Sequence, residues 1–274
     1  MTDIPRTIDP STIAGSIEAN LNAYLLSYGS LPGGSVHDSS DVVWADSGVP
    51  VTTFNSAVQA SLTPETAGAA IESVIAHFRE RSLPFTWHVG PSSTPADLTA
   101  RLLAAGLSHD EDEPGMAIEI ARAHRNFPYP PGLTIERVAD RAGLRDWVET
   151  WACGVPDEYR DQLCRRYVDV YQRQGLGPGV PWSYYLARID GVPVGNCKLY
   201  LGEEVAAVHH VVTVHAARRR GIGTAMTLRL LDEALDRGYR VAVLSSSPLG
   251  LGSYSRIGFK QYCHFGRYLF DPGL

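Results

Sequence analysis

The sequence has few cysteines, and their arrangement suits neither a metal site nor a disulfide framework. Its four cysteines are Cys153, Cys164, Cys197 and Cys263, which are widely spaced, with no CxxC pair and no Cys/His cluster at metal-ligand spacing. Structural zinc sites use closely spaced ligands, and small disulfide scaffolds are dense in cysteine. We therefore expect separate thiols and no metal.

Long apolar runs are also missing. No uninterrupted apolar stretch reaches the roughly 18 residues that indicate a membrane-spanning helix. The start, MTDIPRTIDPSTIAGS, lacks the basic segment and apolar core of a signal peptide. We expect a cytoplasmic protein with no membrane partner.

The chain has no excess of positive charge. Its formal net charge is −6, whereas nucleic-acid-binding proteins usually carry a basic face. We therefore expect no nucleic-acid partner, and any bound anion must be held by a local feature. The 274 residues, 44% hydrophobic and 20% charged, are typical of a globular protein with one large domain or two modest ones.

A proline-rich segment near the middle of the chain suggests a domain boundary. Pro128, Pro130, Pro131 and Gly132 separate a strand expected to end near Ile120 from one expected to begin near Leu133. We predict two domains, residues 1–127 and residues 128–274.

The second half alternates strand and helix patterns. The expected strands are 133–138, 182–190, 191–202, 205–214, 239–247 and a pair within 259–270; the expected helices are 139–153, 157–174, one after Gly223 and a short one at 253–257. We predict an α/β fold.

The first half shows the same order more weakly. Strands are expected within 41–62, at 85–90 and at 115–120, and helices at 64–84 and 95–107. Residues 103–107 (LAAGL) then correspond to residues 255–259 (SRIGF). Duplication explains this, but strands and helices alternate in many folds. The first half lacks the glycine-rich turn of the second, with Thr63-Pro64-Glu65-Thr66 in its place.

The turn RRRGIG, Arg218 to Gly223, follows an expected strand and opens an expected helix. The first amides of a helix lack intrahelical partners, and the helix dipole adds positive charge there, so this place attracts anions. Gly221 and Gly223 would permit close approach of phosphate oxygens, and the arginines supply charge. A solvated basic turn is the alternative, because a G-x-G pattern alone is weak.

The turn fits neither a Rossmann fingerprint, since Met226 replaces the third glycine, nor a Walker A loop. With Arg218, Gly221 and Gly223 it resembles the R/Q-x-x-G-x-G/A signature of the GNAT superfamily of acyl-CoA-dependent N-acyltransferases. The Y-x-x-x-G-F pattern of Tyr254 to Phe259 and the order of elements extend the resemblance. It implies a mixed sheet, mostly antiparallel and splayed between two strands, with helices around it; two such domains in tandem, the first degenerate, would account for the whole chain.

The resemblance also implies a site for acetyl-CoA as co-substrate. The pantetheine arm would pair with the strand before the signature, and the diphosphate would lie on the turn. The residues assigned to this site are Val211, Val212, Thr213, Arg218, Arg219, Arg220, Gly221, Ile222, Gly223 and Thr224.

Tyr254 matches the family's usual general acid, which protonates the departing thiolate; a packed surface tyrosine is the alternative. The family's usual glutamate base is missing, because Ala207 and Ala242 stand in its places. His209 lies on the same strand face as Ala207 and could accept a proton, although a structural histidine is an open alternative. Aromatic residues of 147–171 could line an acceptor pocket or pack in the core.

The leading hypothesis is an acetyl-CoA-dependent N-acetyltransferase that acts on a primary amine of a small molecule or amino acid by direct attack on the thioester. Transfer to a protein N-terminus or lysine is a rival. A non-catalytic acyl-CoA sensor is another, which the missing glutamates favour and Tyr254 opposes. The acceptor, the acyl length, the oligomeric state and the role of the first half stay open.

Overall fold

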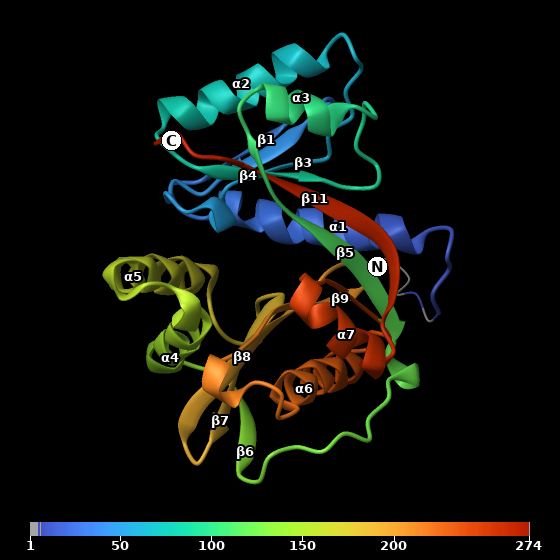
Figure 1. The fold of residues 1–274 in the computed structure, drawn as a ribbon, viewed down its shortest axis with the longest axis vertical. Coiled ribbons are helices and arrows are strands. Elements are labelled where there is room, and N and C mark those ends of the chain that lie inside the picture. Colours follow the sequence, from blue (N-terminus) through green and yellow to red (C-terminus); the bar gives the residue numbers. More distant parts are fainter. Residues whose placement is uncertain (1–4, 6, 274) are drawn as a thin grey trace. The chain divides into compact units, whose positions relative to one another are not determined.

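The computed structural model describes residue 5 and residues 7–273 (Figure 1). By contacts, the chain divides into two compact units. Unit 1 comprises residues 117–244 and 250–260 with the described residues up to Asp9, and unit 2 comprises residues 10–116, 245–249 and those from Gln261 onward. The domains 1–127 and 128–274 stay a prediction. The contact-based units differ from them, because residues 117–127 belong to unit 1 and the residues from Gln261 onward belong to unit 2.

Unit 2 is a mixed sheet with helices on both faces. The hydrogen-bonded order of its strands is β1-β2-β3-β4-β11-β5, with β3 and β4 parallel. In Figure 1, α2 and α3 lie on one side of these strands and α1 on the other. The elements are α1 (Ile13–Leu26), β1 (Ser35–Asp38), β2 (Val43–Asp46), β3 (Ser56–Val58), α2 (Ala67–Glu80), β4 (Phe85–Val89), α3 (Leu98–Ala104), β5 (Ser108–Glu119) and β11 (Lys260–Phe270).

Helix α2 shows why this sequence folds onto the sheet. Its apolar residues Ile71, Val74, Ile75 and Phe78 recur at helical spacing, and all of them are buried. They join one core with Phe85 and other side chains of the unit. The expected helix at 64–84 therefore exists, three residues into that segment.

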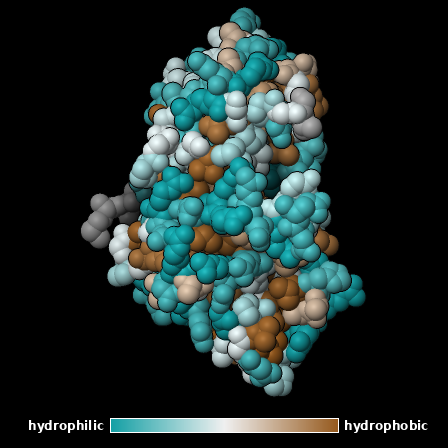
Figure 2. All heavy atoms as spheres, turned by 90° about the vertical axis from the view of Figure 1, so that its left-hand side faces the viewer, coloured by the Kyte–Doolittle hydropathy of each residue, from teal (hydrophilic) through white to brown (hydrophobic). Residues whose placement is uncertain are grey.

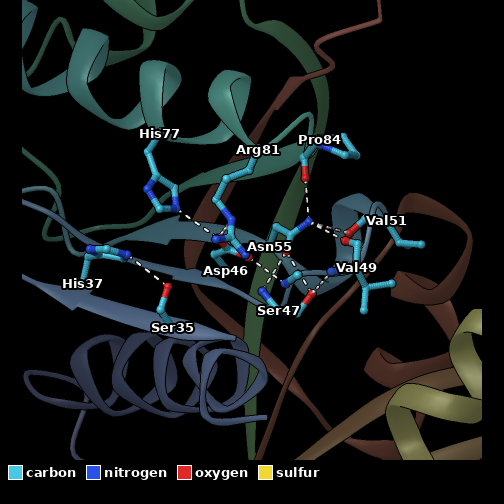
Figure 3. A network of polar contacts seen from close by, with 11 residues as sticks. Ser35, His37, Asp46, Ser47, Val49, Val51, Asn55, His77, Arg81 and Pro84 are labelled. Carbon is cyan, nitrogen blue, oxygen red and sulfur yellow. Dashed lines mark hydrogen bonds and ion pairs between the residues drawn. The ribbon is translucent and has the colours of Figure 1, made fainter. Parts of the chain in front are cut away.

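A polar network supports the loop between β2 and β3 (Figure 3). The Asn55 side chain donates to the carbonyls of Val49 at 2.9 Å and Pro84 at 2.8 Å, and it accepts from the amide of Ser47 at 3.0 Å. The fully buried carboxylate of Asp46 contacts His77 at 3.0 Å and Arg81 at 2.5 Å. Both buried polar groups thus have the partners that burial demands.

Unit 1 has the strand order β5-β10-β9-β8-β7-β6, counting the last residues of β5, and β9 and β10 are parallel. Its other neighbouring pairs from β6 to β9 are antiparallel. The elements are β6 (Leu133–Arg137), α4 (Arg141–Trp151), α5 (Asp157–Gln174), β7 (Trp182–Ile189), β8 (Val192–Leu201), β9 (Ala206–Thr213), α6 (Ile222–Asp236), β10 (Val241–Ser245) and α7 (Pro248–Ile257).

Helices α4 and α5 cover one face of the unit 1 sheet, and α6 covers the other (Figure 1). The aromatic residues Trp147, Tyr167 and Tyr171 are buried to 1% exposure or less in the first of these layers. They pack edge to face, with the Trp147 and Tyr171 ring centroids 5.6 Å apart. Of the two interpretations open for these side chains, the structure supports core packing.

Strands β9 and β10 separate after a short paired stretch. Their register covers Ala206 with Ala242 and Ala207 with Val243, and within the described chain it goes no further. Strand β9 nevertheless continues to Thr213, held on its other edge by β8. The edge of β9 that faces β10 is therefore open beyond Ala207.

Some expected elements differ from those observed. The expected strand pair within 259–270 is one long strand, β11, and α7 begins at Pro248 rather than near Ser253. Strand β11 pairs with β4 from Gly266 to Phe270, a long-range contact that sequence periodicity does not report. Helix α1 and strand β1 were not predicted.

None of the described helices is long and apolar enough to cross a membrane. On the face in Figure 2, hydrophobic side chains form small groups among hydrophilic ones.

Candidate active site

The turn between β9 and α6 has an unusual backbone. A short 3₁₀ segment, His215–Ala217, leads to Arg218, and Gly221 then caps α6 with φ of +81°. Arg219 also has a positive φ, of 62°. The left-handed conformation at position 221 suits glycine, because a side chain would be strained there.

The backbone amides from Arg219 to Thr224 make no hydrogen bond to any acceptor in the described part of the chain. The first bond of the helix start runs from the Ala225 amide to the Gly221 carbonyl, at 2.9 Å. Such amides at a helix N-terminus, reinforced by the helix dipole, favour an anion. The turn can thus hold a phosphate largely through its main chain.

Four arginines surround the same turn without carboxylate partners. Among the residues that the structure describes, no ion pair includes Arg218, Arg219, Arg220 or Arg256. Arg218 Nε donates to the carbonyl of Thr213 at 3.1 Å, and Arg256 to the Ser253 hydroxyl at 3.1 Å. Their positive charge is therefore available to a bound anion.

A cavity of about 470 Å³ lies beside the turn, within unit 1. Its lining residues are Phe127, Pro128, Tyr129, Pro130, Pro131, Arg219, Arg220, Gly221, Thr224 and Arg256. Of these residues, the sequence analysis assigned Arg219, Arg220, Gly221 and Thr224 to the coenzyme site. It did not identify Arg256 or the proline-rich segment. That segment was interpreted as a boundary, and its aromatic residues next to the prolines were the available signal.

The assigned residues of β9 lie close to the helix start. A Cβ added to Gly223 would lie 3.7 Å from Thr213 Oγ1 and 3.8 Å from Val211 Cγ1. Gly223 therefore lies next to the side chains of Val211 and Thr213, in the part of β9 beyond its pairing with β10. The side chain of Ile222 is buried to 1% exposure, so its amide is the group that faces the turn.

Tyr254 lies on α7 and is half-buried. Burial raises the pKa of its phenol above the ordinary 10.0, and the nearby Cys197 thiol adds to this. Its carbonyl accepts from the amides of Gly258 and Phe259, both at 3.1 Å, which ends the helix. The Tyr254 phenol therefore stays protonated, as a proton donor must.

His209 lies opposite Lys198 in the β8–β9 register. Burial, with a contribution from the Lys198 charge, lowers the pKa of His209 to about 3. Lys198 is fully buried, donates to Gln174 Oε1 at 3.2 Å, and lies 4.6 Å from the ring centre of Tyr171. His209 is therefore neutral at ordinary pH.

His210 occupies a bulge next to His209. Its φ is +52°, and the register shifts between Asn196 and Lys198 on the partner strand. Its ring packs against Trp147 with centroids 5.8 Å apart, so His210 belongs to the aromatic layer. No group of three or more His, Cys, Asp or Glu side chains in the described residues is placed to hold a metal.

Comparison with known families gives a match in the second half of the chain. Residues 144–259 match the model of the Acetyltransferase (GNAT) family. No curated protein matches the sequence.

Solved structures match over nearly the whole chain. A GCN5-related N-acetyltransferase from Kribbella flavida has a TM-score of 0.72 at 19% identity, covering 96% of both chains. A tandem GNAT protein from the clavulanic acid biosynthesis pathway has a TM-score of 0.59 at 14% identity, covering 99% of this chain and 98% of its own. An N-acetyltransferase of the same kind from Sphaerobacter thermophilus has a TM-score of 0.55 at 16% identity, covering 98% and 97%.

At these low identities, the structural matches show the fold alone, which is a tandem of two GNAT-like units. The family match covers the half that carries the open turn and Tyr254. Over residues 144–259, the C-terminal half of the chain thus matches the GNAT acetyltransferase family.

Proposed function

We propose that unit 1 transfers the acetyl group of acetyl-CoA to the primary amine of a small molecule or amino acid by direct attack on the thioester. The observation that carries the proposal is the open edge of β9, which leads into a turn whose amides from Arg219 to Thr224 have no acceptor in the described chain. An extended arm that bears amides and ends in phosphates has the chemistry that this path would receive.

The coenzyme would bind through main-chain groups first. Its pantetheine amides would pair with Val211, Val212 and Thr213, and its diphosphate would accept from the amides of the turn. Arg218, Arg219 and Arg220 would add charge, since guanidinium groups bind phosphate in charge-assisted hydrogen bonds. No metal is needed in this scheme to balance the phosphate charge.

Tyr254 is the proposed general acid. The amine nitrogen attacks the thioester carbonyl carbon, the C–S bond breaks, and the departing thiolate takes the phenolic proton. A phenol with a raised pKa is fully protonated at neutral pH. The phenol therefore still holds its proton when the basic thiolate develops.

His209 is the proposed proton acceptor. A conjugate acid with a pKa of about 3 makes it a weak base, so it would not deprotonate a free ammonium group. The amine must therefore arrive neutral, and His209 would receive the more acidic proton present once the C–N bond has formed. Neutral imidazole provides the lone pair that this step requires.

Calorimetry with coenzyme A, together with thiol release from acetyl-CoA across a panel of acceptors, tests the proposal. The panel holds small primary amines, amino acids, and peptides with a free N-terminus or lysine. We expect binding and turnover with a compact amine. Turnover with peptides alone would move the acceptor to proteins, binding without turnover would indicate a sensor, and no binding would contradict the proposal.

A further inference from the structure

A cluster of polar and aromatic side chains in unit 2 joins β1 and β2 to the last turn of α2, and the proposed acetyl transfer does not use it (Figure 3). In the β1–β2 register, His37 lies opposite Trp44, so both share one face of the sheet. Asp46, two residues after Trp44, lies on the same face. Helix α2 covers this face with two side chains that contact the strands. We call the set the histidine cluster; its members are His37, Trp44, Asp46, His77 and Arg81.

The His37 ring lies between two other rings. It stacks on the Trp44 indole, with ring centroids 4.9 Å apart and planes 7° apart. It also meets the His77 ring edge to face, at 4.6 Å between centroids. Its Nε2 lies 3.0 Å from Ser35 Oγ. The ring is half-buried, so a proton from water can reach it, and the charge would then lie at the contact between β1 and α2.

A positive charge on His37 would have no carboxylate to itself. The groups whose charges act on His37 are His77 and Arg81 of α2 and Asp46 of β2. The fully buried Asp46 carboxylate already contacts His77 at 3.0 Å and Arg81 at 2.5 Å. Asp38, the next residue of β1, lies on the opposite face of the strand. Protonation would therefore add a further cation beside a carboxylate that already has two partners.

The direction of the pH effect follows from this arrangement. Burial lowers the pKa of His37 below its ordinary 6.5, the charges of His77 and Arg81 add to this, and Asp46 opposes it. In a detached β1 the imidazole would have its ordinary pKa. The open form therefore binds the proton more tightly, so the contact is fully stable above about pH 6.5 and weakens as the pH falls below that value.

Strand β1 is the part of the cluster that opens most easily. It stands at the end of the strand order, and its register with β2 covers residues 35–38 alone. Short elements at the end of a sheet belong to the least stable parts of a fold. Loss of the His37 contacts would thus act on an element with a short register.

We propose that the histidine cluster is an acid-sensitive latch, in which protonation of His37 releases β1 from the last turn of α2. Imidazoles are the side chains that act as such switches near neutral pH. The inference concerns unit 2 and does not depend on acetyl transfer. It gives the half of the chain without the glycine turn a response to pH of its own.

Hydrogen exchange of the full chain at about pH 7.5 and about pH 5.5 tests the latch. Protection factors are compared, because they correct for the intrinsic pH dependence of exchange. For the amides of β1 and the last turn of α2 they should fall at the lower pH by up to roughly tenfold, the advantage of an open form that titrates one unit higher. His37→Phe, which keeps an aromatic ring beside Trp44, and His37→Gln, which does not, both lack the titrating group and should lose this fall.

The difference between the parent and the His37 variants is the decisive quantity. Burial also lowers the pKa of His88, to about 3, so a fall shared by the whole of unit 2 is expected in every variant. His109→Gln is the matched control, because it removes an exposed histidine that contacts Asp112 outside the cluster; it should behave as the parent does. An equal fall in the parent and in both His37 variants, or no fall in the parent, would overturn the inference.

Discussion

Two parallel strand pairs in this molecule begin alike and end differently. In unit 2, β3 pairs with β4 through Ser56 with Thr86 and Ala57 with Trp87; in unit 1, β9 pairs with β10 over an equally short stretch. After β4 the chain turns back, and the Thr94 amide donates to the carbonyl of Ala60 at 2.9 Å. In unit 2, the chain after β4 thus pairs with the residues that follow β3. In unit 1, the corresponding edge of β9 is left open.

The helices that follow these strands also differ at their first turn. In α2, the Thr66 amide donates to Thr63 Oγ1 at 3.3 Å and the Ala67 amide to the Thr63 carbonyl at 3.0 Å. Arg101 Nη1 donates a hydrogen bond to the Pro64 carbonyl at 2.9 Å. The Thr66 and Ala67 amides of α2 thus have protein acceptors, whereas the amides of Arg219 to Thr224 at the start of α6 have none in the described chain.

A third difference lies at the ends of α3 and α7. The Leu107 amide donates to the Leu102 carbonyl at 3.1 Å, as the Phe259 amide donates to that of Tyr254. Leu102 is fully buried, so the position of the proposed acid holds an apolar core residue in unit 2. Equivalent backbones with different side chains indicate that the fold is kept in unit 2, and we expect the chemistry to be confined to unit 1.

The largest expected effect on coenzyme affinity comes from a side chain added at Gly223. Gly223→Val should weaken coenzyme A binding by roughly 100-fold, about 2.7 kcal/mol, because its side chain would lie between β9 and the turn. Calorimetry measures the change. Gly68→Val is the matched control, since Gly68 is also the second residue of its helix and has no atom within 4 Å of an added Cβ.

Gly221 is a less suitable position for this test. Gly221→Val would also place a side chain at the turn. The positive φ and the nearby Pro128 carbonyl mean that a side chain there would disturb the turn and the adjacent segment. A loss of binding could then come from misfolding alone.

The second effect concerns the proposed acid. Tyr254→Phe should lower kcat by roughly 100-fold with a nearly unchanged affinity for coenzyme A, because the phenolic proton matters for the departing thiolate. Steady-state kinetics and calorimetry check both quantities. Tyr239→Phe, which removes a hydroxyl that donates to the Gly202 carbonyl, is the matched control; a parental rate in the Tyr254 variant would dismiss the role.

The pH dependence follows from the same group. A raised pKa means that Tyr254 loses its proton above pH 10.0, its ordinary value. We expect kcat measured in stopped assays to show no decline from this group up to about pH 10. A falling limb near pH 8 that disappears in Tyr254→Phe would contradict the raised pKa.

A smaller effect is expected at His209. His209→Gln should lower kcat roughly tenfold without changing the shape of the profile between about pH 6 and 9, because a group with a pKa of about 3 is already deprotonated throughout that range. The rate, and not the profile, is therefore the informative quantity. An unchanged rate would remove His209 from the mechanism.

The smallest effect should come from unit 2. Thr63→Ala and Thr66→Ala remove hydroxyls from the first turn of α2 and should cost about 1 kcal/mol of unfolding free energy or less, measured in urea. The affinity for coenzyme A should stay unchanged in calorimetry. Weaker coenzyme binding in either variant would show that the two helix starts are not as distinct as we propose.

Much of unit 1 could be predicted because its signals are local. The helix expected at 157–174 matches α5, whose apolar side chains recur at helical spacing, and the turn with its glycines lies between a strand and a helix as expected. The family-like motifs located Tyr254 on a helix as well. Local periodicity and turn chemistry sufficed for these elements.

Long-range features could not be read from the sequence. The pairing of β11 with β4 joins residues far apart in the chain, and periodicity contains no information about such partners. Lys198 looks like an ordinary surface lysine in the sequence, although it is fully buried among aromatic rings. Arg256 and Tyr129 come to one cavity from different segments, so the cavity required the folded chain.

A crystal structure of the protein saturated with coenzyme A tests the central claim most directly. We predict that the diphosphate lies on the amides of Arg219 to Thr224, with the pantetheine arm along β9. Coenzyme bound in unit 2, or a saturated crystal without coenzyme at this turn, would contradict the account.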